Sequence, residues 1–298
     1  MDLLFTGASG FLGINIKPIL DLNYNITTVG MSPDDDYQVD LSKAIPSFSE
    51  IYDVVIHAAG MAHFVPESKE EYEIFFNVNY QGTVNLCRAL ERVGVPGALI
   101  FISSVAVYGI DSGENITEEH PLNGTSPYAL SKIKAEEFLI DWCRCKNVIL
   151  GIIRPSLLAG PNPPGNLGDM IKAIDKGKYL SIGRGRARKS VLMVQDIANL
   201  ISKLAEKGGI YNVCDNYQPT FRELEYLIAS QLGKKVPLSV PYWVARLMAW
   251  VGDCIGNKAP INSMKMNKIT ENLTFSSEKA QKELCWKPME VISCFKIR

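Results

Sequence analysis

The stretch Thr6-Gly7-Ala8-Ser9-Gly10-Phe11-Leu12-Gly13 decides the fold of this chain. It follows an apolar run at residues 3–5, expected as a buried strand, and it leads into residues 11–20, whose apolar side chains recur at helical spacing. Glycines let the backbone turn tightly and approach a pyrophosphate, whose negative charge then faces the N–H groups at the start of the helix. The stretch therefore predicts a dinucleotide site. A glycine-rich turn without a ligand is the alternative, and the G-x-x-G-x-x-G spacing differs from the G-x-G-x-x-G of ordinary dinucleotide dehydrogenases.

Strand-like and helix-like segments alternate through the first half of the chain. Strands are expected at residues 3–5, 25–29, 53–56, 98–102 and 148–153, and helices at residues 11–20, 70–93 and 128–145. This alternation predicts an α/β fold with a doubly wound, parallel Rossmann-type sheet that is covered on both faces.

A change of texture after Arg154 indicates a second part. Prolines and glycines crowd the loop at residues 155–165, and shorter segments follow it. Residues 1–155 are therefore predicted to form the dinucleotide-binding domain. Residues 156–298 are predicted to form mainly a smaller, interleaved substrate-binding lobe, with some segments returning to the first domain.

Composition excludes several classes of partner. The 31 Lys and Arg residues nearly balance the 32 Asp and Glu residues and form no block, so neither nucleic acid nor a membrane is an expected partner. The most apolar late stretch, residues 241–255, contains Arg246 and Asp253 and is too short to cross a bilayer. The first strand leaves no room for a signal segment, and seven cysteines without C-x-x-C spacing fit a reducing compartment, so we expect a cytoplasmic protein. The three histidines show no metal-ligand spacing, so no metal is expected.

Tyr128 and Lys132 lie four residues apart in a predicted helix and therefore share one face. Thr125 or Ser126 can cap this helix and Pro127 suits its first position, so Tyr128 falls in the first turn, where the helix dipole favours a phenolate. A phenol with a pKa near ~10 is a poor base at neutral pH. The ammonium of Lys132 and an oxidised nicotinamide are expected to lower the Tyr128 pKa. A tyrosine packed on a lysine stem is the alternative, because Y-x-x-x-K is a common pattern.

Ser103 and Ser104 directly follow the predicted strand at residues 98–102. In a parallel sheet, ligands bind outside the carboxyl ends of the strands, so a serine here faces the cofactor cleft. Its hydroxyl can donate to a substrate oxygen while Tyr128 moves the proton. A serine that only caps the strand end is the alternative.

Together these motifs resemble the extended short-chain dehydrogenase/reductase superfamily, in its NAD(P)-dependent nucleotide-sugar epimerase/dehydratase branch. The matching segments occur in family order: TGASGFLG at 6–13, DL at 40–41, HAAG at 57–60, NVNYQGT at 77–83, SSVAVYG at 103–109, YALSK at 128–132 and RP at 154–155.

The resemblance implies roles for individual residues. The implied catalytic residues are Ser104, Tyr128 and Lys132. The implied cofactor-binding residues are Gly7, Gly10, Phe11, Leu12, Asp40, Leu41, Ala58, Ala59, Gly60, Asn79, Tyr128, Lys132 and Pro155. The implied substrate-binding residues, which would meet the diphosphate of a nucleotide sugar, are Asn166, Arg186, Arg188 and Lys189. A solvated basic loop is the alternative for the run at residues 183–190.

The cofactor is expected to be NAD, with NADP left open. The second predicted strand ends in Gly30-Met31-Ser32, which supplies neither the acid typical of NAD enzymes nor the arginine typical of NADP enzymes. Asp34, Asp35 and Asp36 follow, and three carboxylates would repel a 2′-phosphate.

The expected reaction is that of an epimerase that transfers hydride at C4 of a UDP- or dTDP-hexose or hexosamine. The related dehydratases place an Asp-Glu pair where this chain has Val105-Ala106, which cannot move protons, so dehydration is disfavoured. A 4-ketoreductase of the same superfamily is the first alternative. A non-catalytic dinucleotide-binding protein is the second, and the intact Ser/Tyr/Lys set argues against it. A homodimer is expected, with contacts through the helices at residues 70–93 and 128–145.

Overall fold

A computed structural model describes residues 1–62, 66, 68–255 and 262–297. Its centre is a sheet of seven parallel strands in the order β11-β7-β5-β4-β1-β2-β3. The strands are β1 (Asp2–Thr6), β2 (Asn25–Gly30), β3 (Tyr37–Gln38), β4 (Val54–His57), β5 (Ala98–Ile102), β7 (Ile149–Pro155) and β11 (Gly209–Val213). The predicted α/β class and doubly wound parallel sheet are confirmed.

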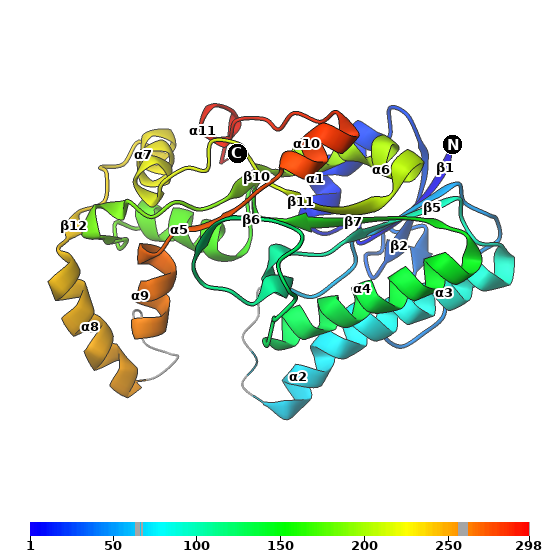
Figure 1. The fold of residues 1–298 in the computed structure, drawn as a ribbon, viewed down its shortest axis with the longest axis horizontal. Coiled ribbons are helices and arrows are strands. Elements are labelled where there is room, and N and C mark those ends of the chain that lie inside the picture. The colour runs from blue at the N-terminus through cyan, green and yellow to red at the C-terminus, as the bar shows by residue number, and fades with distance from the viewer. Residues whose placement is uncertain (63–65, 67, 256–261, 298) are drawn as a thin grey trace.

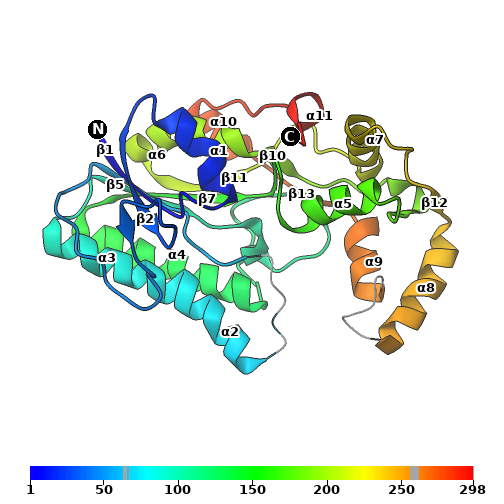
Figure 2. The same ribbon diagram turned by 180° about the vertical axis from the view of Figure 1, so that it is seen from behind.

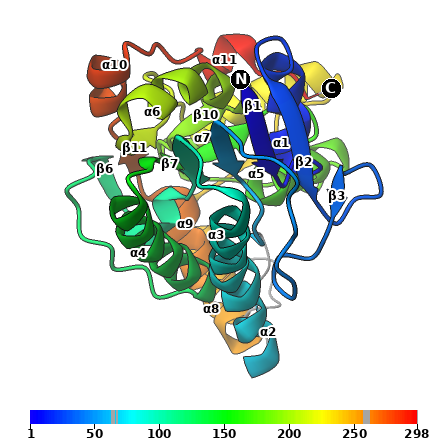
Figure 3. The same cartoon turned by 90° about the vertical axis from the view of Figure 1, so that its right-hand side faces the viewer.

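Helices cover both faces of this sheet (Figures 1 and 3). One face carries α1 (Phe11–Leu20), α6 (Ile201–Lys207) and α10 (Glu278–Leu284). The other carries α2 (Lys69–Phe75), α3 (Gly82–Val93) and α4 (Pro127–Lys146), with the π-helical segment η1 (Phe76–Gln81) joining α2 to α3. β1 shows why the strands are apolar throughout: Leu3 and Phe5 pack in the core under α1, and Leu4 packs in the core under α3 and α4.

The order of the strands creates a crevice at one edge of the sheet. The chain runs from β1 outward to β2 and β3, then returns to place β4 on the other side of β1. Ligands of doubly wound sheets bind at such a switch point, outside the carboxyl ends of the strands. Thr6 pairs in register with both Val29 and His57, so the segments that follow β1, β2 and β4 leave the sheet side by side.

The second half of the chain forms the remaining elements, seen from behind in Figure 2. Its helices are α5 (Gly165–Asp175), α7 (Phe221–Leu232), α8 (Tyr242–Ile255), α9 (Ser263–Thr270) and α11 (Val291–Cys294), with 3₁₀ segments η3 (Gly183–Gly185) and η4 (Val194–Leu200). Its strands form two-stranded pairs, β8 (Leu157–Ala159) with β10 (Val191–Met193) and β9 (Ser181–Ile182) with β12 (Ser239–Val240), and β13 (Leu273–Phe275) pairs with β6 (Gly113–Ile116) from the first half of the chain. The strand β11 joins the central sheet beside β7. The division of the chain at residue 155 stays a prediction.

No helix in the described part of the chain is both long enough and apolar enough to span a membrane.

Candidate active site

The glycine-rich turn lies at the carboxyl end of β1, against the end of β4. Gly7 has a φ of +77°, and a Cβ at this position would lie 2.7 Å from the backbone nitrogen of Ala59. A Cβ on Gly13 would lie 2.3 Å from the carbonyl oxygen of Ala8, so the first turn of α1 packs closely on the loop. The N-cap of α1 is Gly10, which has no side chain to bond the first N–H groups. The start of the helix therefore presents these N–H groups to the edge of the sheet, as an anion site requires.

A neutral histidine supports this turn from behind. His57, at the end of β4, is fully buried, with Nδ1 2.7 Å from Oγ1 of Thr6 and Nε2 2.8 Å from Oγ1 of Thr83. Thr83 donates its own hydroxyl proton to the carbonyl oxygen of Asn79, so Nε2 of His57 donates to Thr83 and Nδ1 accepts from Thr6. Burial lowers the pKa of His57 to about 3, with a smaller contribution from the Lys132 charge. The ring is therefore a fixed spacer and not an acid at neutral pH.

Gly60, Asn79 and Lys132 meet at the same edge of the sheet. A Cβ on Gly60 would lie 2.9 Å from Oδ1 of Asn79 and 3.2 Å from Nζ of Lys132. Asn79 is buried in the π-helical segment η1, a kind of irregularity that is frequent at functional sites. Its Oδ1 accepts from the backbone nitrogen of Met61 at 2.7 Å, and its Nδ2 donates to Oγ of Ser131 at 2.9 Å. The amide is thus held on both sides, and it ties the segment after β4 to α4.

Lys132 is buried in α4 and turned toward β5. Its Nζ donates to the carbonyl oxygen of Ile102 at 2.8 Å and lies 4.6 Å from the ring centroid of Phe101. Burial lowers the pKa of Lys132 to about 8, against an opposing effect of Glu136. The ammonium is therefore fixed by β5, at the edge where the glycine turn and Gly60 lie.

Ser104 and Tyr128 come together across the first turn of α4. Ser104 is the N-cap of the 3₁₀ segment η2 (Val105–Tyr108), and Tyr128 follows the cap Ser126, whose Oγ accepts from the backbone nitrogen of Ala129 at 3.1 Å. The side chain of Ser104 is near enough to the Tyr128 hydroxyl to lower its pKa, and the ring of Phe75 packs edge-on against the half-buried tyrosine. The two groups expected to share a substrate oxygen therefore lie next to each other.

The acidity of Tyr128 departs from the expectation drawn from the sequence. Burial raises the pKa of Tyr128, and the nearby side chain of Ser104 only partly opposes this. The Lys132 ammonium, which donates to the carbonyl oxygen of Ile102, does not lower the Tyr128 pKa here. On the charges of the chain alone, the phenol is neutral at physiological pH.

A buried ion pair, which the sequence did not reveal, fixes the elements that carry these residues. Glu136, two turns beyond Tyr128 on α4, accepts from Nε of Arg154 at 3.1 Å and also from Nη2. It further accepts from the hydroxyl of Ser103, the neighbour of Ser104. Nη1 of Arg154 donates to the hydroxyl of Tyr108 at 3.0 Å. Burial lowers the pKa of Arg154, but the hydrogen bonds and charge of Glu136 outweigh this and raise it.

The acidic loop after β2 has divided roles. Asp36 accepts from both the backbone nitrogen and the hydroxyl of Thr28, and the backbone hydrogen bond is the main reason why its pKa is lowered. Asp35 folds back to the tip of β2, where its Oδ2 accepts from the backbone nitrogen of Ser32 at 2.9 Å. A Cβ on Gly30 would lie 2.4 Å from this oxygen. A carboxylate therefore lies at the tip of the strand although the strand itself ends in glycine.

The remaining predicted cofactor residues lie around the same crevice. Phe11 and Leu12 open α1, Ala58 follows β4, and the buried Pro155 ends β7. Leu41 is buried, and its carbonyl oxygen accepts from Nδ2 of Asn85. Asp40 bonds the backbone nitrogen and hydroxyl of Ser42, and the hydroxyl bond is the main reason why its pKa is lowered.

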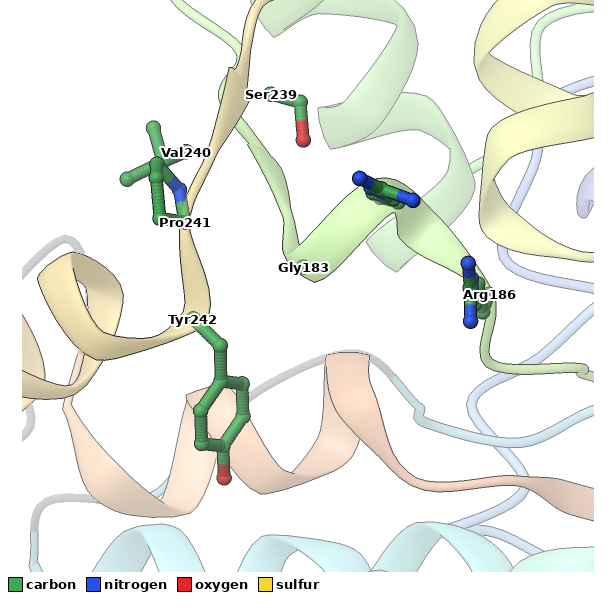
Figure 4. A pocket seen from close by; sticks show the side chains of 7 residues that line it. Gly183, Arg186, Ser239, Val240, Pro241 and Tyr242 are labelled. Carbon is green, nitrogen blue, oxygen red and sulfur yellow. The ribbon is translucent and has the colours of Figure 1, made fainter.

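Of the predicted substrate residues, Arg186 lines a pocket between η3 and the start of α8 (Figure 4). The other lining residues are Gly183, Arg184, Ser239, Val240, Pro241 and Tyr242. Arg184 received no role from the sequence, although it stands in the same arginine-rich run. Two exposed guanidinium groups on one pocket suit a diphosphate.

The other predicted substrate residues are placed differently. Arg188 donates from Nη1 to the carbonyl oxygen of Gln218 at 2.9 Å and stacks near Tyr217. Lys189 is half-buried, and burial lowers its pKa to about 8. Asn166 is exposed in the first turn of α5. Within the described residues no hydrogen bond or ion pair joins these side chains to Arg186, so their shared role stays a prediction.

Comparison with known proteins identifies the group to which this architecture belongs. The model of the NAD-dependent epimerase/dehydratase family matches residues 3–214. This chain belongs to that family. The match confirms the predicted family, the class of enzyme and the NAD(P) cofactor class.

Individual members of the epimerase/dehydratase family show the range of its chemistry. The chain is 29% identical over 300 residues to the N-acetyl-alpha-D-glucosaminyl-diphospho-ditrans,octacis-undecaprenol 4-epimerase of Escherichia coli O157:H7. The alignment covers 93% of this chain and 88% of that protein. It is 30% identical over 243 residues to the GDP-6-deoxy-D-mannose reductase of Pseudomonas aeruginosa, covering 76% of this chain and 79% of that one. The structure of Thermus thermophilus UDP-glucose 4-epimerase with NAD has the same fold, with a TM-score of 0.73 at 24% identity over 97% of this chain and 94% of that chain.

Proposed function

We propose that this chain is a C4 epimerase of sugars that are attached to their carrier through a diphosphate, with a UDP- or dTDP-hexose or hexosamine as substrate. The observation that carries the proposal is the placement of Ser104 and Tyr128 side by side at the carboxyl edge of the sheet, beside the crevice formed by the glycine turn. An acid-base group with a second hydroxyl next to it is what the oxidation and reduction of a secondary alcohol require.

The chain supplies a cradle that fits a dinucleotide. Gly7 and Gly60 are positions where a side chain would meet backbone or polar atoms, and the N-cap Gly10 leaves the start of α1 open to an anion. NAD(P) bound there would supply the hydride acceptor and donor for C4. Asp35 at the tip of β2 supports NAD over NADP, because its carboxylate would repel a 2′-phosphate.

Three residues would divide the proton chemistry. Tyr128, held as the phenolate by the positive charges of Lys132 and of an oxidised nicotinamide, would take the proton of the C4 hydroxyl and later return it, while Ser104 would hold the same oxygen by a hydrogen bond. Lys132, fixed against β5, would bind a ribose hydroxyl and add positive charge to a site in which burial raises the Tyr128 pKa. Val105 and Ala106 follow Ser104 in η2 and cannot transfer protons, which argues against dehydration.

The carrier is the less specified part of the substrate. The E. coli relative is named for a sugar on a lipid diphosphate, and the Thermus structure is named for a sugar on UDP. A diphosphate is common to both, and the pocket with Arg184 and Arg186 is suited to that group. A 4-ketoreductase is the alternative, supported by the likeness to the Pseudomonas reductase.

The test is incubation of the purified protein with a panel of UDP- and dTDP-sugars, with and without added NAD(P)H, followed by product analysis. Interconversion of C4 epimers without net cofactor consumption is the result that we expect. Cofactor consumption that occurs only with 4-keto sugars would select the reductase instead.

We also propose a homodimer whose contact involves the segments expected from the sequence, residues 70–93, which form α2, η1 and α3, and residues 128–145 of α4. α4 exposes Leu130 and Ile140 on its outer side, two apolar residues that a partner helix would cover. Sedimentation of the wild type and of an Ile140→Glu variant tests this contact: the variant should be the smaller species.

A further inference from the structure

The helix α8 has its small side chains inside and its large apolar side chains outside. Ala245 and Ala249 are 1% and 0% exposed, whereas Trp243 and Trp250 are 67% and 69% exposed. Four further large apolar residues of this helix are exposed as well: Tyr242, Leu247, Met248 and Val251. A surface helix of a globular protein normally buries its large apolar residues, so this face is unusual for water.

The position of α8 leaves the face open within the described part of the chain. Figures 1 and 2 show α8 as the outermost element at one end of the molecule, with α9 on its inner side. The buried stripe with Ala245 and Ala249 packs there against Met266 of α9 and Ile182 of β9. The small residues therefore serve to bring α8 close to the body, and the large ones stay largely exposed among the described residues.

The charges around this face complement an anionic surface. Arg246 is exposed and stands four residues from both Tyr242 and Trp250, so it lies on the same side of the helix. Tyr242 also lines the pocket with Arg184 and Arg186, so two further positive charges lie next to the apolar face (Figure 4). The carboxylate of α8, that of Asp253, is bonded to the backbone nitrogen and hydroxyl of Ser263.

This combination matches a helix that lies in a lipid interface. Trp and Tyr prefer the headgroup level of a bilayer, where their rings are apolar and their polar atoms remain solvated. Arginine can lay its stem along the apolar face and direct its guanidinium to phosphates.

A second copy of the chain fits the face less well. Symmetric pairing of α8 with itself would bring two Arg246 guanidinium groups toward each other at the centre of the contact, and like charges that lose water are costly there. The dimer proposed above also uses other helices.

We propose that α8 docks the protein on an anionic membrane surface, with Trp243 and Trp250 inserted at the headgroup level and Arg246 on lipid phosphates. The sequence led us to expect no membrane partner, because the charges are balanced without a basic block and because residues 241–255 cannot cross a bilayer. A helix that lies in the interface need not cross it. The proposal stands apart from the proposed reaction, since vesicle binding is measured without substrate or cofactor.

The test is co-sedimentation of the full chain with vesicles of phosphatidylcholine alone or mixed with phosphatidylglycerol. The wild type should bind the mixed vesicles, more weakly at high salt, and a Trp243→Ser/Trp250→Ser variant should bind at least about tenfold more weakly. Replacement of two exposed apolar residues elsewhere, Leu22→Ser/Tyr226→Ser, should leave binding unchanged. Arg246→Glu should remove the preference for phosphatidylglycerol.

Two results would overturn the proposal. One is a wild type that does not sediment with phosphatidylglycerol vesicles. The other is a self-association that the Trp243→Ser/Trp250→Ser variant abolishes while vesicle binding is absent, which would assign the face to a second copy. Unfolding curves of each variant show whether a loss of binding comes from misfolding. Because the substituted positions are exposed, the curves should match that of the wild type.

Discussion

The buried pair of Glu136 and Arg154 should be the most sensitive polar site in the scaffold of the active site. Glu136→Gln keeps the shape of the side chain but removes its charge, and it turns an amide N–H₂ toward a guanidinium or hydroxyl that also donates. Arg154 is 3% exposed, so its charge would remain buried without a counterion. Removing one partner of a buried pair costs about 3–5 kcal/mol of unfolding free energy.

Urea denaturation measures this loss directly. Glu137 is the matched control, because it is the next residue of α4 and is exposed, so Glu137→Gln should change the unfolding free energy by less than about 0.5 kcal/mol. Removing both charges together, as Glu136→Leu/Arg154→Met, should restore part of the lost stability, since no unpaired charge then remains. Glu136→Gln with the stability of the wild type, or a double variant worse than the sum of the single variants, would refute the reasoning.

Three further predictions concern the crevice. Gly7→Ala should lower the unfolding free energy by at least about 2 kcal/mol and weaken NAD binding, because Gly7 has a positive φ and a Cβ would meet the backbone of Ala59. Gly177→Ala is the control: Gly177 has a positive φ but no neighbour within 4 Å, so this variant should show only the backbone cost. Equal losses of stability in urea for the two variants would contradict the prediction. Burial lowers the pKa of Lys132 to about 8, below its value of ~10.4 in the unfolded chain. Between these two pH values the unfolded state binds more protons, so the unfolding free energy should rise with pH across that window. Lys132→Met should flatten this rise, and an unchanged slope would show that another group titrates. Asp35→Asn should narrow the preference for NADH over NADPH in a fluorescence titration, and a wild type that binds NADPH more tightly would remove Asp35 from this role.

Much of this architecture could be predicted from sequence because its determinants are local. Apolar runs set the strands, and turn residues mark where they end. In a parallel sheet, all carboxyl ends lie at one edge. Once the strands are known, this rule places Gly7, His57 and Ser104 at the same edge of the sheet. The Tyr128 helix was equally accessible, because its cap and its first proline are adjacent in sequence.

What could not be predicted depends on contacts between distant segments. Glu136 and Arg154 lie on different elements, and only the packing of α4 on β7 pairs them. Helical spacing gave no signal for the contact of Lys132 with β5, where the carbonyl oxygen of Ile102 holds its ammonium. The helix predicted over residues 70–93 contains a π-helical segment that seats Asn79, and periodicity gives no signal for it. The outward apolar face of α8 likewise depends on α9, which packs against its small residues.

The turnover of Tyr128→Phe tests the central claim most directly. With a substrate identified in the panel, the variant should lose about two to four orders of magnitude in kcat, the usual contribution of a positioned acid-base group, while NAD affinity stays close to that of the wild type. Tyr72→Phe, at an exposed tyrosine of α2, should leave kcat unchanged. A Tyr128→Phe enzyme that turns over at a near-normal rate would show that the proton moves through another group.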